Sequence, residues 1–258
     1  MHRYYVAELA EWLARGGPLV LAGEEARHLV RVKRARPGEE VLLFDGRGAE
    51  CWARLERVES GRAVLCVLER PSPRLQAPLR LRVALAPPER PRLLWAVEKL
   101  TELGVQAVSL LQSERGQERA GSLDRLRRRA LEAAKQCGVL VPPAIQGPLR
   151  LQDALGAGAG WRCVVLDARA ELALVQALGV LERGAGVVLA VGPAGGFTEA
   201  ELAAARAAGA VCARLGPTVL RTETAAVAAA AVAVALAGAA GRSERREAAG
   251  PDEATGGA

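Results

Sequence analysis

The sequence of 258 residues predicts a small β-rich region followed by an α/β region with a mostly parallel sheet. Three observations predict this fold class. Short β-like runs separated by glycine turns fill residues 1–70, a proline-rich stretch follows at 71–78, and strands then alternate with helices. We therefore expect one domain at 1–71, a linker at 72–78 and a second domain at 79–241.

The N-terminal region contains three expected strands, EVLLFDGRG, AECWARLERVE and RAVLCVLER, with turns at DGRG and ESGR. Their spacing predicts a small antiparallel barrel or sheet. The stretch EEARHLVRVKRARPG precedes them and predicts a short helix that Pro37 and Gly38 end.

Strands and helices alternate in the second region. The expected elements, in order, are the strand LRLRVALAP, the helix PRLLWAVEKLTELG, the strand QAVSLL, the helix SLDRLRRRALEAAKQCG, the strands WRCVVLDA and GVVLAVGP, a helix from Thr198, the strand AVCARLG and a final alanine-rich helix. This alternation indicates parallel strands joined by helices. The polar tail 242–258 predicts disorder.

The alanine-rich stretch 224–241 has no charged residue and is long enough to suggest a membrane span. Alanine gains little free energy on transfer into lipid, but it is the best helix former and lets neighbours approach closely. We therefore expect a buried helix and no membrane contact. The N-terminal stretch MHRYYVAELAEW lacks the apolar core of a signal peptide, so we expect a cytoplasmic protein.

Charge and cysteine content narrow the classes of partner. The net charge of +6 and the isoelectric point near 9.5 permit an acidic partner such as RNA. The five cysteines are scattered without a CxxC pair, and the chain has only two histidines, so no metal site is expected. Most cysteines lie in apolar runs, which predicts small core residues in a reducing compartment.

A glycine cluster, AVGPAGGFTEAEL, follows the expected strand GVVLAVG and opens into a helix. The Gly-Lys-Ser/Thr of a Walker A loop and the GxGxxG of a dinucleotide site are both missing, which excludes these two phosphate cradles. Thr198 and Glu201 form a capping-box pattern that accounts for the helix start. The glycines lie where a parallel strand ends, the usual edge for ligands in open α/β sheets.

A second loop of this kind is ARLGPTVLRTETAA, residues 213–226. A strand again runs into a Gly-Pro turn and then a helix, with a polar cluster at 221–224. One interpretation is structural: a threonine caps the helix and Arg221 pairs with Glu223. The other is that the two loops together form a ligand site.

The paired motifs GPAGGFTEAEL and LGPTVLRTETAA resemble those of the RsmE-type 16S rRNA (uracil-N3)-methyltransferases of the SPOUT superfamily. Supporting matches are EKLTELGV (98–105), SER (113–115), EAAKQCG (132–138) and HLVRVKRARPGEEVLLFDGRG (28–48). The resemblance covers residues 1 to about 240. It implies an N-terminal PUA-like RNA-binding β-barrel and an α/β domain with a C-terminal trefoil knot. It also implies S-adenosylmethionine as cofactor, a homodimer, and 16S rRNA or the small ribosomal subunit as partner.

The resemblance places the cofactor between the two loops, where backbone groups hold its adenine and Leu215, Leu220 and Leu166 pack around it. The expected cofactor-binding residues are Leu166, Gly192, Pro193, Gly195, Gly196, Leu215, Gly216, Leu220, Thr222 and Thr224. A cofactor without phosphate needs no lysine, which agrees with the missing phosphate motifs.

Two residues are expected to be catalytic. Arg221 stays protonated and would stabilise negative charge on the uracil. Glu223 would accept the N3 proton or orient Arg221. The basic residues Arg27, Arg31, Lys33, Arg34 and Arg36 are expected to bind RNA phosphates, although a solvated helix face explains the same pattern.

The chain departs from the family pattern at four places. Ala194 stands where the family usually has glutamate, Val139 and Thr218 where it commonly has arginine, and PPERPR (87–92) where it has a Lys-Gly start. Two alternatives therefore stay open: a catalytically weak or silent RNA-binding factor, and a SPOUT methyltransferase of different RNA specificity, such as ribose 2′-O or guanine N1.

Overall fold

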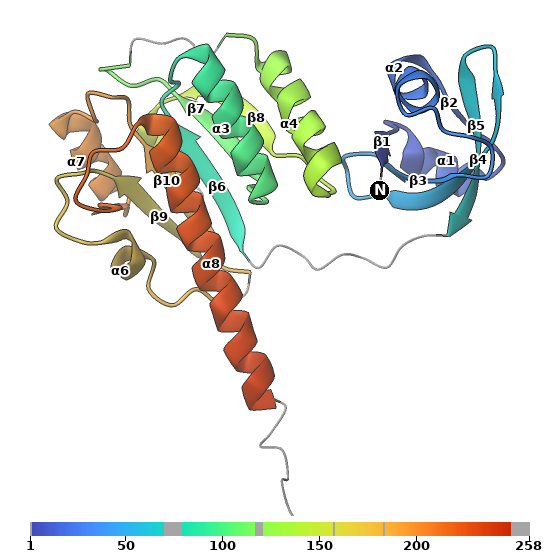
Figure 1. Cartoon of the computed structure of the whole chain (residues 1–258). Helices are drawn as coiled ribbons and strands as arrows, with labels where there is room; N and C mark the ends of the chain where they lie inside the picture. Colours follow the sequence, from blue (N-terminus) through green and yellow to red (C-terminus); the bar gives the residue numbers. More distant parts are fainter. Residues whose placement is uncertain (1, 70–78, 117–120, 157, 183, 249–258) are drawn as a thin grey trace, which may run out of the picture. The chain divides into compact units, whose positions relative to one another are not determined.

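The computed structural model describes residues 2–69, 79–116, 121–156, 158–182 and 184–248 (Figure 1). These residues form two compact units, one from 1–76 with 128–142 and the other from 77–127 with 143–258. The linker expected at 72–78 lies outside the described residues. The boundaries at 71 and 79 therefore stay a prediction.

The first unit is built on a five-stranded sheet with the order β1-β3-β4-β5-β2. Its strands are β1 (Arg3–Tyr5), β2 (Leu19–Leu21), β3 (Glu40–Phe44), β4 (Glu50–Glu59) and β5 (Arg62–Glu69). All pairings are antiparallel except β1 with β3. The three expected strands are confirmed as β3, β4 and β5. The strands β1 and β2 were not predicted, because three residues are too few to show alternation.

Three short helices accompany this sheet: α1 (Leu9–Arg15), α2 (Gly23–Arg27) and a single π-helical turn η1 (His28–Val32). The helix expected to reach Pro37 ends earlier than predicted. Arg34 adopts φ +55°, a left-handed conformation that a side chain makes costly and that no α-helix continues. The chain therefore leaves the helix before the proline.

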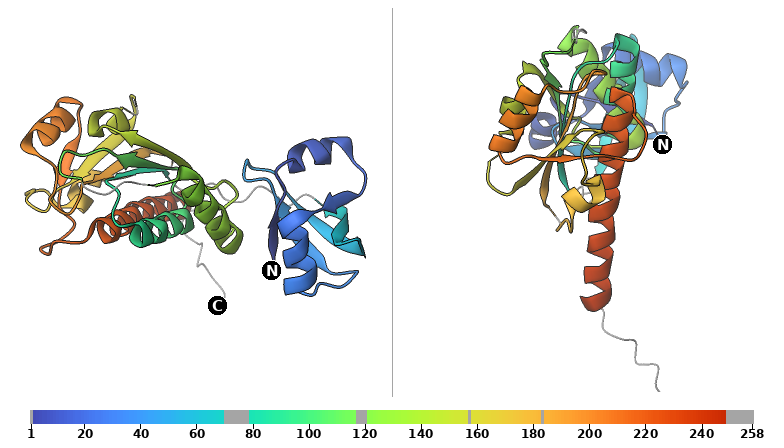
Figure 2. Two further views of the ribbon diagram at one scale, coloured as in Figure 1. Left: turned by 90° about the horizontal axis from the view of Figure 1, so that it is seen from above. Right: turned by 90° about the vertical axis from the view of Figure 1, so that its left-hand side faces the viewer.

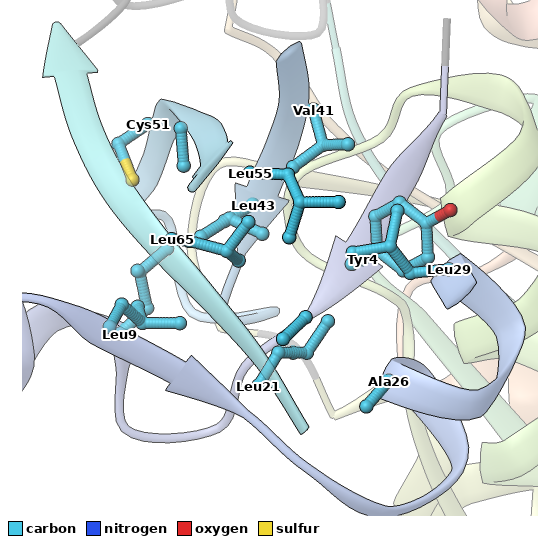
Figure 3. Close-up of a cluster of buried hydrophobic side chains, with 13 residues drawn as sticks. Tyr4, Leu9, Leu21, Ala26, Leu29, Val41, Leu43, Cys51, Leu55 and Leu65 are labelled. Carbon is cyan, nitrogen blue, oxygen red and sulfur yellow. The ribbon is translucent and has the colours of Figure 1, made fainter. Parts of the chain in front are cut away.

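The core of the first unit packs side chains from the sheet and helices together (Figure 3). Tyr4 of β1, Leu29 of η1 and Leu43 of β3 are completely buried. Burial disfavours the phenolate and raises the pKa of Tyr4 to about 12, so this side chain is neutral in the core.

The second unit has a six-stranded sheet with the order β11-β9-β10-β6-β7-β8. Its strands are β6 (Arg80–Leu85), β7 (Ala107–Leu111), β8 (Ala144–Leu149), β9 (Trp161–Leu166), β10 (Gly186–Val191) and β11 (Val211–Ala213). Every pairing is parallel, as predicted. The edge strand β8, with sequence AIQGPL, was not predicted, because Gly and Pro interrupt its pattern and only an edge position tolerates the proline.

Helices cover both faces of this sheet (Figures 1 and 2). The helices α3 (Arg90–Glu102) and α8 (Thr222–Ala248) pack together on one face, and α5 (Leu151–Leu155) and α7 (Glu199–Ala207) pack together on the other. Every residue of β10 is buried between them, which explains its uninterrupted apolar sequence. The other helix of this unit is α6 (Leu174–Leu178), and α4 (Leu123–Cys137) begins in this unit while its residues from 128 onward belong to the first.

The alanine-rich stretch forms α8, which packs on β10, β6 and α3 as a buried helix. Its buried alanines are Ala225, Ala226, Ala229, Ala230, Ala233 and Ala237. None of the helices in the described ranges is long and apolar enough to cross a membrane. The helix continues to Ala248, so disorder was wrongly expected for 242–248, where Arg, Glu and Ala all favour helix propagation. Residues 249–258 lie outside the described residues.

The cysteines differ from the expectation of core residues. Cys51 is buried, Cys163 and Cys212 are partly covered, and Cys66 and Cys137 are exposed; none forms a disulfide. Cys66 lies on the outward side of β5 and Cys137 ends α4, so an apolar neighbourhood in sequence did not bring burial. Within the part of the chain that the structure describes, no group of His, Cys, Asp and Glu could hold a metal ion.

Candidate active site

Three neighbouring strand ends form the candidate site. The strands β11, β9 and β10 lie next to each other, so the loops that follow their carboxyl ends meet at one edge of the sheet. These loops enclose a cavity of about 230 Å³. It is lined by residues 166–169, 191–197, 213–216, 218–220, 222 and 225.

The cavity brings together nine of the ten expected cofactor-binding residues. They are Leu166, Gly192, Pro193, Gly195, Gly196, Leu215, Gly216, Leu220 and Thr222. Thr224 is the exception, because its side chain lies on a neighbouring hollow. The two glycine loops, twenty residues or so apart in the sequence, therefore form one site.

A hydrogen bond connects the two loops directly. The hydroxyl of Thr222 donates to the carbonyl of Gly192 over 3.0 Å, and Thr222 is only 8% exposed. The structural interpretation, in which this threonine caps its own helix, does not describe this contact. Since a buried hydroxyl and a buried carbonyl satisfy each other, the bond fixes the first residue of α8 against the end of β10.

Two of the glycines have conformational reasons to be glycine. A Cβ on Gly192 would lie 3.1 Å from the ring of Phe197, which is buried beneath the loop. Gly196 has φ +68°, in the left-handed region, and its amide donates to the carbonyl of Pro193 to close the turn. The bare backbone at the cavity is thus a consequence of how tightly this loop turns.

The helix behind the first loop begins as predicted. The amide of Glu201 donates to the Thr198 hydroxyl over 3.2 Å, and the amide of Thr198 donates to the Glu201 carboxylate over 2.8 Å. Glu201 also accepts from the amide of Glu114, and Arg115 donates to the carbonyl of Gly195 over 3.0 Å. The SER segment therefore supports the loop, a role that sequence spacing alone did not reveal.

An ion-pair chain that the sequence did not predict lies at the cavity wall. Arg169 contacts the carboxylate of Asp167 at 3.2 Å and that of Glu199 at 3.0 Å. Burial opposes ionisation of Asp167, but hydrogen bonds from the side chain and backbone of Arg169 outweigh it and lower the pKa of Asp167. The cavity thus has an ionised carboxylate from Asp167. Ala194, which is exposed at the same cavity, contributes no carboxylate where the family usually has a glutamate.

The two expected catalytic residues lie together on the other side of the second loop. Arg221 and Glu223, with Thr224, line a hollow whose remaining wall is Arg92 and neighbouring residues of α3. Glu223 is only 6% exposed, and its Oε1 lies 3.7 Å from Nε of Arg92. Its ion-pair partner is therefore Arg92, from the PPERPR segment, rather than Arg221 as the structural interpretation supposed.

The expected RNA-binding residues lie on the first unit. They are Arg27, Arg31, Lys33, Arg34 and Arg36, and all five are exposed. The intervening Ala26 and Leu29 point into the core, so the helical turns α2 and η1 present their basic side chains outward. The geometry fits both interpretations, a phosphate-binding surface and a solvated face.

The cavity between the loops fits S-adenosylmethionine by its chemistry. Its walls are leucine side chains and glycine backbone, which can pack on an adenine and hydrogen-bond its edge. The carboxylate of Asp167 and the guanidinium of Arg169 could meet the charged amino acid end of the cofactor.

Comparison with known proteins gives consistent results. Residues 75–234 match the model of an RNA methyltransferase domain, and residues 21–69 match an RNA methyltransferase PUA domain. The second match contains the basic cluster. The chain is also similar to two curated proteins named ribosomal RNA small subunit methyltransferase E. The one from Mycobacterium bovis is 35% identical over 86% of this chain and 87% of its own length. The one from Bacillus subtilis is 27% identical over 87% and 93%.

Solved structures agree in fold over nearly the whole chain. A ribosomal RNA small subunit methyltransferase E from Neisseria gonorrhoeae, bound to S-adenosylmethionine, is 31% identical with a TM-score of 0.81, covering 92% of this chain and 98% of its own. A methyltransferase from Legionella pneumophila in complex with the same cofactor is 27% identical with a TM-score of 0.77, covering 90% and 96%. A PUA domain followed by a SPOUT-type α/β domain is thus the fold of this chain.

Proposed function

This chain belongs to the RNA methyltransferase family that includes the ribosomal RNA small subunit methyltransferases E, and we propose that it methylates N3 of a uridine in 16S rRNA with S-adenosylmethionine as donor. One observation carries this proposal. The segment 220–224 has on one side a cavity whose loops lack a phosphate-binding motif. On its other side lies the buried carboxylate of Glu223 with Arg221 nearby. The relatives' names and the cofactor of the solved neighbours support it.

S-adenosylmethionine, when bound, supplies a methyl carbon that bonds to N3 while its bond to sulfur breaks, with the electron pair staying on sulfur and the N3 proton leaving. Since the donor has a good leaving group, the protein contributes mainly by positioning the reactants. Leu166, Leu215 and Leu220 would surround the adenine. Thr222 would hold the two loops at a fixed separation through its bond to Gly192. We assign no cofactor contact to Thr224.

Arg221 and Glu223 have separate tasks in this proposal. Arg221 is always protonated, so it cannot accept a proton, but it can stabilise the negative charge that develops on the uracil. Glu223 can accept the N3 proton, because a carboxylate is a proton acceptor and this one lines the same hollow as Arg221. Orientation of Arg221 is the alternative task for Glu223, and the two are separated by the Glu223→Gln variant.

We further propose that the basic cluster Arg27, Arg31, Lys33, Arg34 and Arg36 holds rRNA phosphates, because all five side chains are exposed on the PUA domain. The enzyme is proposed to act as a homodimer with a C-terminal trefoil knot, as the family resemblance implies. We also propose a cytoplasmic location, because an enzyme that modifies 16S rRNA acts where small ribosomal subunits assemble.

The test is transfer of labelled methyl from S-adenosylmethionine to free 16S rRNA and to small ribosomal subunits, followed by mass spectrometry of the nucleosides. The proposal predicts 3-methyluridine, lost in Arg221→Ala. A methylated guanosine or ribose would mean a different RNA specificity. No transfer despite measurable binding of RNA and cofactor would indicate a silent RNA-binding factor. That outcome would agree with Ala194, which stands where the family usually has glutamate.

A further inference from the structure

One wall of the cofactor cavity is the segment 167–173, which joins β9 to α6. Its first three residues line the cavity and include the ion pair of Asp167 and Arg169. The segment itself forms neither a helix nor a strand. Contacts with other parts of the chain must therefore hold these two charges at the cavity.

Arg214 fastens the middle of this segment. Its Nη1 donates to the carbonyl of Ala170 over 2.8 Å and also to the carbonyl of Glu171. Its backbone adds two bonds, since its amide donates to the carbonyl of Leu172 over 2.9 Å and its carbonyl accepts from the amide of Leu174 over 2.8 Å. Hydrogen bonds from a charged donor are stronger than neutral ones, so the guanidinium contributes a large share of this attachment.

The start of the wall is held in a different way. Leu166 ends β9 and pairs with the neighbouring strands β10 and β11. The amide of Asp167 donates to the carbonyl of Ala213 over 3.0 Å. Pairing along the sheet thus fixes the leucine side of the wall, whereas the side chain of Arg214 fixes the chain beyond it, which carries Arg169.

The charges on this wall are complementary to one end of the cofactor. Arg169 is exposed at the cavity, and its guanidinium can pair with a carboxylate. The carboxylate of Asp167 can pair with an ammonium. The amino acid end of S-adenosylmethionine has both of these groups, and its adenosine end has neither.

We propose that Arg214 is the positioning residue for the amino acid end of S-adenosylmethionine, because it holds the segment beyond Asp167 so that Arg169 faces that end. The inference rests on the proposed function for its cofactor. It adds a residue that acts on the cofactor through Arg169 and not by its own contact with the adenosine.

Calorimetry with two matched ligands tests the inference without methyl transfer. S-adenosylhomocysteine and 5′-methylthioadenosine share the adenosine and an uncharged thioether sulfur, but only the first has the amino acid end. Arg214→Ala should weaken binding of S-adenosylhomocysteine about 10-fold and that of 5′-methylthioadenosine less than about twofold. Arg214→Lys retains a charged donor and should restore most of the affinity. Equal weakening of the two ligands, or no weakening, overturns the inference.

Two further variants make this comparison safe. Arg127→Ala is the matched control, because it removes another arginine that donates to a backbone carbonyl, that of Ile145 at 3.2 Å, outside the cavity. It should bind both ligands as the wild type does. If Arg214→Ala does not fold, Arg214→Gln, which retains one amide donor, takes its place and should show the same selective loss to a smaller extent.

A double-mutant cycle tests the route through Arg169. Arg169→Ala alone should weaken S-adenosylhomocysteine selectively. Adding Arg214→Ala should then weaken it by less than about a further twofold, because two residues that act through one contact are not additive. Full additivity of the two changes would mean that Arg214 acts by another route, and would overturn the inference.

Methyl transfer separates this inference from the proposed function. Arg214→Ala should raise KM for S-adenosylmethionine about 10-fold and keep kcat within about twofold, because Arg214 lines the cavity and not the hollow of Arg221. If the wild type forms 3-methyluridine and Arg214→Ala has the wild-type KM, the inference fails while the proposed function stands. If the wild type forms no 3-methyluridine but the calorimetric loss is selective, the proposed function fails and the inference stands.

Discussion

The two proposed RNA-facing regions of this protein are built in opposite ways. The catalytic region uses buried groups held by specific bonds, such as the hydroxyl of Thr222 on Gly192 and the carboxylate of Glu223 beside Arg92. The basic cluster on the PUA domain uses exposed side chains, with Arg27 and Arg31 on two short helical turns and Lys33, Arg34 and Arg36 on the segment that follows them. In our proposal the first region works through the positions of its groups and the second through its summed positive charge.

This comparison teaches how each region should respond to substitution. A single change at Arg221 or Glu223 should lower methyl transfer strongly, because each has its own proposed task, although Glu223 is buried and Arg221 is exposed. A single change should only weaken the basic cluster, because phosphate contacts contribute separately and each is screened by salt.

The largest effects are expected at Arg221 and Glu223. Arg221→Ala removes the cation that we propose stabilises charge on the uracil, and loss of one such group typically costs about 100–1,000-fold in kcat. Single-turnover methyl transfer to 16S rRNA measures it. Arg62→Ala, which removes an exposed arginine from the first unit, serves as the control and should leave kcat unchanged.

A comparable loss is expected in Glu223→Gln if this carboxylate accepts the proton, since general-base catalysis typically contributes about 100–10,000-fold. The amide keeps the shape of the side chain but cannot accept a proton. Single-turnover rates at saturating cofactor measure the effect. Full activity with normally bound cofactor would remove the base role.

A smaller effect is expected at the bond between the two loops. Thr222→Val keeps the side-chain shape but leaves the Gly192 carbonyl without its donor, which costs about 1–3 kcal/mol for a buried group. We expect the affinity for S-adenosylmethionine, measured by calorimetry, to fall about 10-fold, at 1.4 kcal/mol per tenfold. Thr222→Ser retains the hydroxyl and should keep wild-type affinity; an unchanged affinity in Thr222→Val would mean that the bond does not shape the cavity.

In the basic cluster, Lys33→Ala should weaken RNA binding only a few-fold. The slope of log K against log salt should decrease in magnitude by about 0.7–0.9 for each lost phosphate contact. Filter binding at several salt concentrations measures the slope. If Lys33→Ala and the control Arg62→Ala give the same slope as wild type, the cluster is only a solvated face.

The smallest effect is a pH dependence at the cavity wall. Arg169 lowers the pKa of Asp167 below its usual 3.8, so the pair stabilises the fold at neutral pH and this contribution is lost as the pH falls through the lowered pKa. Arg169→Ala should therefore lower the melting temperature at pH 7 and differ little from wild type at the acid end. Asp167→Asn should remove this pH dependence. If the melting temperatures of wild type and Arg169→Ala differ more at acid pH than at pH 7, the prediction is contradicted.

The sequence predicted what local pattern and motif determine. Apolar runs identified β10 and the other long strands of the second sheet, and Thr198 with Glu201 identified the start of α7. The strands β1 and β2, of three residues each, and β8, which Gly and Pro interrupt, were not predicted. The family resemblance predicted the paired glycine loops as one site, and the ends of parallel strands bring them to one edge.

The partners of the site residues could not be predicted. Arg92, Trp95, Arg115 and Arg169 come from other parts of the chain, and only the packing of α3 and the strand ends brings them to the loops. An arginine-rich composition also hides a functional arginine among many surface ones.

We propose that Arg221 serves methyl transfer and not cofactor binding. The most direct test measures both in the same preparation of Arg221→Ala. Because Arg221 faces the hollow and not the cavity, the account predicts wild-type affinity for S-adenosylmethionine by calorimetry together with loss of 3-methyluridine by nucleoside mass spectrometry. An affinity that falls in parallel with the product would show that the two sides of segment 220–224 are not separate, and would contradict the account.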